Sequence, residues 1–174
     1  MDRVMLVTRG ALAATLMVAG TFLHTSVAAA QESNKDLVNA LQAKHVALAT
    51  GIEAASTKGK PISAKYEYED GKLQLSVYTE KGGAFSEVIV NHQTGKVAKA
   101  EKITEGDDLK NAKSQSAAAA KAKSSLASAL EKALAANAGY SAVGAEATLK
   151  DGKPVAEITL MKGTETKKVT QPLD

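Results

Sequence analysis

The sequence predicts an α+β fold made of two tandem repeats, each an N-terminal helix packed on a three- to four-stranded antiparallel sheet. The tripeptide Asp-Gly-Lys occurs at 70–72 and again at 151–153, an offset of 81 residues (151 − 70). The chain stays in phase at this offset without a gap, with matched pairs that include Ile62 with Val143, Ala64 with Ala145, Val77 with Ile158, Gly82 with Gly163 and Val88 with Val169. Two copies do not make a solenoid, which needs at least about three repeats. We therefore expect two small domains, at 31–103 and 104–174, with two small cores.

The first thirty residues have the pattern of a secretory signal peptide. Arg3 and Arg9 precede an apolar run at 11–23, and small residues close the segment at 28–30. This order of charged, apolar and small residues predicts a signal peptide over 1–30, cleaved after Ala30. The apolar run is about 13 residues long, whereas a membrane span needs about 20. We expect a periplasmic protein with no membrane attachment after cleavage.

The composition excludes several classes of function. The chain has no cysteine, which excludes thiol catalysis, zinc thiolate sites and iron–sulfur clusters. Both arginines lie in the predicted signal peptide, so the remaining 144 residues (174 − 30) carry only lysine as strong base, with 20 lysines (22 − 2) against 18 carboxylates (19 − 1). Arginine is the residue best suited to bidentate recognition of phosphate and guanine. We expect no nucleic-acid partner.

The first repeat begins with a helix. We predict it over 35–57 from a cap at Ser33 and from apolar residues that share one stripe at helical spacing: Leu37, Leu41, Leu48 and Ile52. Gly51 lies inside this helix and weakens it by up to about 1 kcal/mol relative to alanine. The run at 58–61 ends in Pro61, which disfavours helix in the residue before it.

Four strands follow the first helix. From Ile62 to Glu69 apolar and polar residues alternate, as in a strand with one solvated face. Asp70-Gly71 is a strong hairpin signal, and a second strand follows at 73–77. Turns at 81–83 and 91–96 lead to a third strand at 85–90 and a short fourth strand at 97–103.

The second repeat follows the same order. Residues 104–123 are rich in charge, serine and alanine and are predicted to be an exposed connection that runs into a long helix over 108–138. Strands are predicted at 141–150, 154–162 and 165–171. Pro154 cannot donate a ladder hydrogen bond, so its strand should start there or lie at an edge. Positive φ is expected at four glycines: Gly71, Gly95, Gly139 and Gly152.

The repeat resembles the PepSY family of exported bacterial domains. The resemblance rests on the segment ISAKYEYEDGKLQLSVYTEKGGAFSEVIVNHQTGKV after an alanine-rich helix, and above all on its ending VIVNHQTGKV at 88–97. The second copy, VGAEATLKDGKPVAEITLMKGTETKKVTQPLD, is similar but departs from the pattern after Val169. The resemblance implies a binding module or a regulator of peptidases outside the cytoplasm. It supplies no catalytic residues.

The sequence gives no sign of an enzyme. Beyond residue 30 the histidines are His45 and His92, and neither belongs to an HExxH motif. Serines are numerous, but no GxSxG or Ser-x-x-Lys motif accompanies them. We therefore expect a non-enzymatic protein with no catalytic residues and no cofactor.

Carboxylates are the remaining candidates for a site. They form two clusters, near the first hairpin and before the second long helix: Glu67, Glu69 and Asp70, and Glu105, Asp107 and Asp108. Hard cations such as calcium take several oxygen ligands. Neither cluster has the spacing of a calcium loop, and nearby lysines oppose the accumulation of cations. These six residues are weak metal candidates.

Two functions follow as hypotheses. The first is a binding or regulatory module whose partner is an envelope protein, such as a peptidase, or an extended peptide added at a sheet edge. The expected edges are the strand near Pro154 and the terminal strand around Val169. The alternative is a periplasmic buffer or carrier that binds calcium or trivalent ions through carboxylates.

Overall fold

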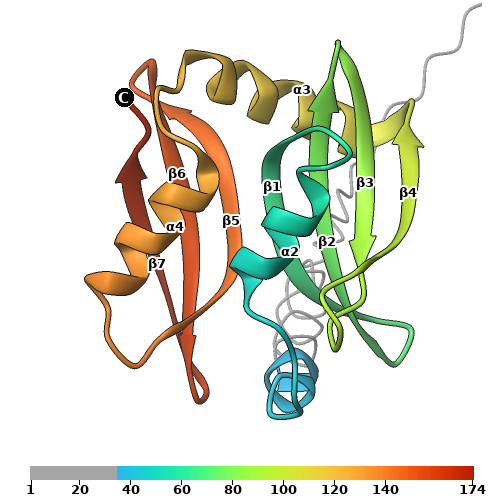
Figure 1. The fold of residues 1–174 in the computed structure, drawn as a ribbon. Coiled ribbons are helices and arrows are strands. Elements are labelled where there is room, and N and C mark those ends of the chain that lie inside the picture. Colours follow the sequence, from blue (N-terminus) through green and yellow to red (C-terminus); the bar gives the residue numbers. More distant parts are fainter. Residues whose placement is uncertain (1–34) are drawn as a thin grey trace, which may run out of the picture.

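A computed structural model describes residues 35–174 of the chain as an α+β fold with one seven-stranded antiparallel sheet (Figure 1). This confirms the predicted fold class. The predicted signal peptide lies outside the described residues. Within the described range, no helix combines the length and apolar character needed to cross a membrane.

The sheet has the order β4-β3-β2-β1-β5-β6-β7. Its strands are β1 (Lys60–Glu69), β2 (Lys72–Lys81), β3 (Ala84–Val90), β4 (Val97–Ile103), β5 (Ser141–Lys150), β6 (Lys153–Lys162) and β7 (Glu165–Pro172). The edges are therefore β4 and β7. The prediction of an edge around Val169 is confirmed. The prediction of an edge near Pro154 is wrong, because β6 begins at Lys153 and lies between β5 and β7.

The two-residue turns between β1 and β2 and between β5 and β6 have the predicted chemistry. Asp70 and Gly71 have φ of 50° and 75°, and Asp151 and Gly152 have φ of 52° and 76°. Positive φ at both central residues is the requirement of a type I′ hairpin. Positive φ is also confirmed at Gly95 and Gly139, the other two glycines for which it was expected.

The strand bounds repeat at the offset found in the sequence. Displacing β1 and β2 by 81 residues gives the bounds of β5 and β6. A register shift between Pro61 and Ser63 in the first hairpin recurs between Ala142 and Gly144 in the second. The halves join where β1 pairs with β5 over three residue pairs, centred on Ala64 opposite Ala145. These two residues are themselves related by the offset.

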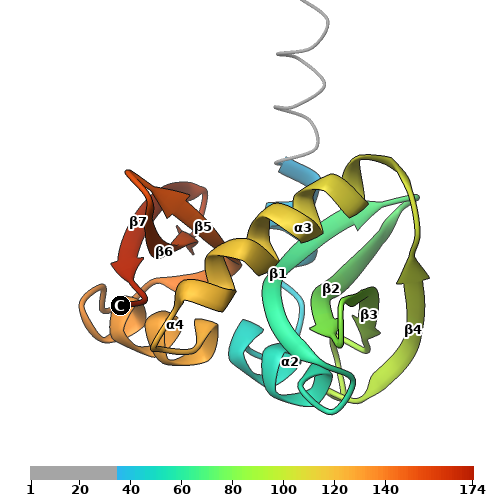
Figure 2. The ribbon, with the colours of Figure 1, turned by 90° about the horizontal axis from the view of Figure 1, so that it is seen from above.

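Helices cover both faces of the sheet. The helices α2 (Leu48–Ala55) and α4 (Leu126–Ala135) contact each other, and α2 packs on β1 to β3 while α4 packs on β5 to β7. The helix α3 (Gly106–Lys121) crosses the junction of β1 and β5 (Figure 2). It lies on the other face, because Ser63 bonds to α3 while Tyr66, three residues on, bonds to the segment before α2.

The buried apolar residues form one core that spans both halves. The expectation of two small cores is therefore wrong. The reason is the continuous sheet and the contact between α2 and α4, which bring residues such as Leu75 and Ile158 into one cluster. Both side chains are fully buried.

The predicted helix over 35–57 is broken. Residues 35–40 are helical, but the chain then turns and is not helical again until α2. Within the break, the backbone N–H of Val46 donates to the carbonyl of His92 at 2.7 Å, and the Tyr66 hydroxyl donates to the Val46 carbonyl at 2.6 Å. These distant hydrogen bonds replace the intrahelical ones.

The predicted helix over 108–138 is also broken, into α3 and α4. At the break, the backbone N–H groups of Lys123 and Ser124 donate to the carbonyl of Leu173 at 2.6 and 2.9 Å. Ser125 then caps α4 by accepting from the N–H of Ser128 at 3.1 Å. The segment 104–123 is more than an exposed connection, since α3 buries three alanines against the sheet: Ala112, Ala118 and Ala119.

Candidate functional site

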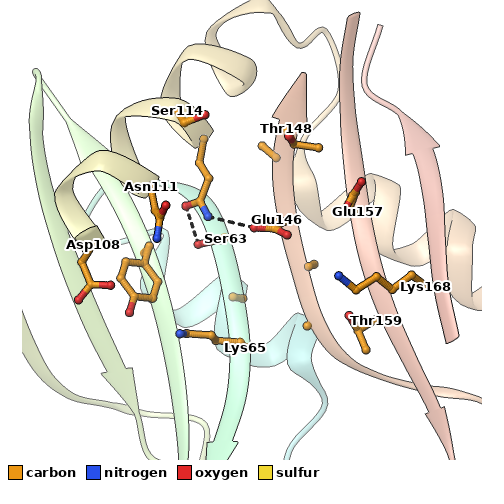
Figure 3. A pocket seen from close by; sticks show the side chains of 16 residues that line it. Ser63, Lys65, Asp108, Asn111, Ser114, Glu146, Thr148, Glu157, Thr159 and Lys168 are labelled. Carbon is orange, nitrogen blue, oxygen red and sulfur yellow. Dashed lines mark hydrogen bonds between the residues drawn. The ribbon is translucent and has the colours of Figure 1, made fainter. Parts of the chain in front are cut away.

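A polar cleft of about 410 Å³ lies beside α3 at the junction of the two halves (Figure 3). Its walls come from β1 and β2, from the polar side of α3, and from β5, β6 and β7. Two features leave this space open. The strands β1 and β5 pair over only three residues, and Gly144 carries no side chain at the junction.

A short hydrogen-bond chain ties the two halves together at the cleft. Ser63 on β1 donates its Oγ hydrogen to Oε1 of Gln115 on α3 at 2.9 Å. Gln115 in turn donates from Nε2 to Oε2 of Glu146 on β5 at 3.2 Å. Because Ser63 is only 7% exposed, this chain fixes both the side chain of Gln115 and one carboxylate oxygen of Glu146.

Two glutamates face each other within the cleft. Glu146 on β5 lies directly opposite Glu157 on β6, and both are half-buried. Within residues 35–174 neither takes part in an ion pair. Like charges at directly opposed positions of neighbouring strands destabilise a sheet. The corresponding positions of the first hairpin hold Lys65 and Ser76, so the first half has no such repulsion.

Two lysines also line the cleft. Lys168 on β7 lies opposite Thr159 in the register, and its side chain extends toward the cleft in Figure 3. Lys65 pairs with Glu67 at 2.5 Å. The cleft thus presents a carboxylate pair with a mobile cation at one side, an arrangement suited to a ligand that carries an amino group.

Tyr78 closes the first-half side of the cleft. Burial raises the pKa of its hydroxyl, and the negative charges of Glu87, Asp108, Glu67 and Glu69 raise this pKa further. The phenol therefore stays protonated at neutral pH and offers a neutral hydroxyl.

The predicted acidic clusters are partly brought together around the ring of Tyr78. Glu67 and Asp108 come from different clusters, yet both charges act on this residue. Asp108 also lines the cleft. Glu69 and Asp70 are exposed at the hairpin, Glu105 precedes α3 without a side-chain capping bond, and Asp107 pairs with Lys110 at 2.8 Å. Among residues 35–174, no group of three or more His, Cys, Asp or Glu side chains is arranged to hold a metal ion.

Sequence reasoning missed Glu146, Glu157 and Gln115. The glutamate pair has a usable signal, because both residues lie five positions from the Asp151-Gly152 turn (151 − 146 and 157 − 152), and a two-residue turn pairs equidistant residues. Gln115 has no such signal. Its role depends on where α3 crosses the sheet.

A scan against protein-family models, a search of curated proteins and a search of solved structures each found no match to this chain.

Proposed function

We propose that this chain is a non-enzymatic binding or regulatory module of the bacterial periplasm, built from two PepSY-like repeats, whose ligand is a basic peptide segment of an envelope protein or peptidase. The duplication is supported by the common strand bounds and by the register shift that recurs at the offset of 81 residues. The PepSY resemblance rests on the strand and turn motifs of the two copies.

The observation that carries the ligand class is the opposed pair Glu146 and Glu157. An arrangement that costs stability in the free protein is expected where a ligand relieves it. An ammonium or guanidinium group placed between the two carboxylates removes the repulsion and gains charge-assisted hydrogen bonds. Gln115 holds Glu146 ready for this contact.

The remaining cleft residues fit the rest of a peptide. A volume of about 410 Å³ accommodates one long side chain with adjoining backbone. Lys168 supplies a cation for a peptide carbonyl or carboxylate, and Tyr78 supplies a hydroxyl that stays neutral. The ligand is therefore a lysine side chain, an arginine side chain or an amino terminus held next to its own backbone.

A binding role is also favoured by how the cleft hydroxyl is engaged. Ser63 donates to the amide oxygen of Gln115, and an amide cannot accept a proton as a general base does. Its hydroxyl is used to position Gln115 and Glu146.

Calorimetric titration tests this proposal. A short lysine-containing peptide is compared with the same peptide carrying Nε-acetyl-lysine, which has the same length but no charge. We expect binding of the first and at least about tenfold weaker binding of the second, the size of one lost charge-assisted hydrogen bond.

Two variants locate the site. Glu157→Gln should weaken binding of the lysine peptide by about tenfold. Glu131→Gln, on the exposed side of α4, makes the same chemical change away from the cleft and should leave binding unchanged. Equal affinity for the two peptides, or equal effects of the two variants, would contradict the proposal.

A further inference from the structure

The strand β4 forms an open edge of the sheet (Figure 1). Residues 98–102 are exposed on both faces, and within the described residues the strand pairs only with β3. Its pairing with β3 is regular from Lys99 to Ile103, after a register irregularity at Ile89 and Val90. An edge of this kind presents unpaired backbone N–H and C=O groups to a further strand.

The side chains of β4 are self-complementary. If a second copy of the strand lies antiparallel about Ala100, Lys99 falls opposite Glu101 of the second copy, and Glu101 falls opposite its Lys99. Lys99 and Glu101 lie on the same face of the strand, opposite Ile89 and Glu87 of β3. They now pair with each other at 2.8 Å, with side chains 61% and 55% exposed. The two charges are therefore free to exchange partners.

The same pairing geometry already exists within the chain. The strands β1 and β5 are antiparallel and centred on Ala64 opposite Ala145, residues related by the offset of 81. That junction places equivalent positions of two similar strands opposite each other. A β4 pair centred on Ala100 would repeat this local two-fold arrangement between two molecules.

We propose that two copies of this chain associate through antiparallel pairing of β4 with β4, which continues the sheet across the dimer. The charge complementarity of Lys99 and Glu101 selects a second copy as the occupant. The pairing is isologous, so it consumes both edges and stops at two molecules. It covers only one short strand from each copy, so the dimer is weak and concentration-dependent.

Sedimentation equilibrium of the purified protein, over concentrations up to about 1 mM, tests the proposal. Lys99→Glu alone and Glu101→Lys alone each place like charges opposite each other twice. Each should raise the dimer Kd by about tenfold or more. An equimolar mixture of the two variants restores both opposite-charge pairs, so it should form a heterodimer with a Kd near that of the wild-type dimer.

Lys102→Glu is the matched control. It makes the same charge change on the same strand, but Lys102 lies on the other face and would be opposite the uncharged Ala98 of the second copy. Its dimer Kd should stay close to that of the wild type. All of these positions are exposed, and circular dichroism of each variant checks that the fold is retained.

Each outcome is decisive. Dimerisation that is lost in both single variants and regained in their mixture supports the β4 pairing. A monomeric wild type at the highest concentration, a dimer unaffected by either reversal, or a mixture that fails to associate would overturn it.

Discussion

Replacing Glu157 by glutamine should stabilise the free protein while it weakens ligand binding. Glutamine keeps the shape of the side chain and removes one of two like charges held directly opposite each other on β5 and β6. Opposed cross-strand pairs are worth about 0.2–1 kcal/mol. We therefore expect the free energy of unfolding to rise by about 0.5 kcal/mol, which for a chain of this size is a rise in Tm of about 2 °C.

Urea denaturation at neutral pH measures this change. The gain should appear as a higher midpoint with an unchanged slope, since the surface exposed on unfolding stays the same. It should shrink as salt is added, because added ions screen the repulsion between half-exposed charges.

Glu67→Gln is the control for this experiment. Glu67 lies on the same face of the sheet, but it faces Gln74 across the hairpin and is ion-paired with Lys65. Its replacement should bring no gain, or a loss of up to about 1 kcal/mol. If Glu157→Gln destabilises the protein as much as Glu67→Gln does, Lys168 already neutralises the pair and the reasoning is wrong.

Three further predictions concern the fold. A Cβ at Gly51 would lie 2.6 Å from Cδ2 of Leu75, so Gly51→Ala should cost about 1–3 kcal/mol by overpacking, whereas improved urea resistance from higher helix propensity would refute it. Gly71 has φ of 75° with open space around it, so Gly71→Ala should lower stability by about 1 kcal/mol through backbone strain alone, and an unchanged Tm would count against the turn. Tyr66→Phe removes the hydrogen bond to the Val46 carbonyl and should cost about 1 kcal/mol. Because burial raises the pKa of Tyr66 from 10.0 to about 12, the fold favours the neutral phenol, and its contribution is present below pH 10 and lost as pH rises toward 12. Over that range the wild type should lose up to about 2 kcal/mol more than Tyr66→Phe, and parallel alkaline denaturation curves would contradict this.

The strands could be predicted because their signals are local. The Asp-Gly turns at 70–71 and 151–152 demand positive φ at both residues. The alternation of apolar and polar residues then sets which side chains share a face. The offset between the repeats carried the first hairpin's pattern to the second.

The helix breaks could not be predicted because their causes are distant in sequence. The carbonyl of Leu173, at the end of the chain, receives the N–H groups that separate α3 from α4. The carbonyl of His92, in the turn between β3 and β4, does the same for the segment before α2. Alanine-rich helix propensity continues through 122–125, and tertiary hydrogen bonds override it.

The cleft was out of reach for a similar reason. Its glutamate pair follows from hairpin register, but the wall opposite depends on α3 crossing the junction, which no local pattern specifies. The acidic clusters visible in the sequence were sought as metal ligands. In the structure Glu67 is ion-paired with Lys65, and Asp108 lies beside the cleft.

The most direct test of the proposed binding site is an NMR titration of the ¹⁵N-labelled protein with the lysine-containing peptide. The account predicts that amide shifts concentrate at 144–148, 157–159 and 63–65, with the side-chain amide of Gln115 among the most perturbed signals. Shifts confined to the edge strands β4 or β7, or to the exposed hairpin at 69–72, or no shifts at all, would contradict a peptide site between Glu146 and Glu157.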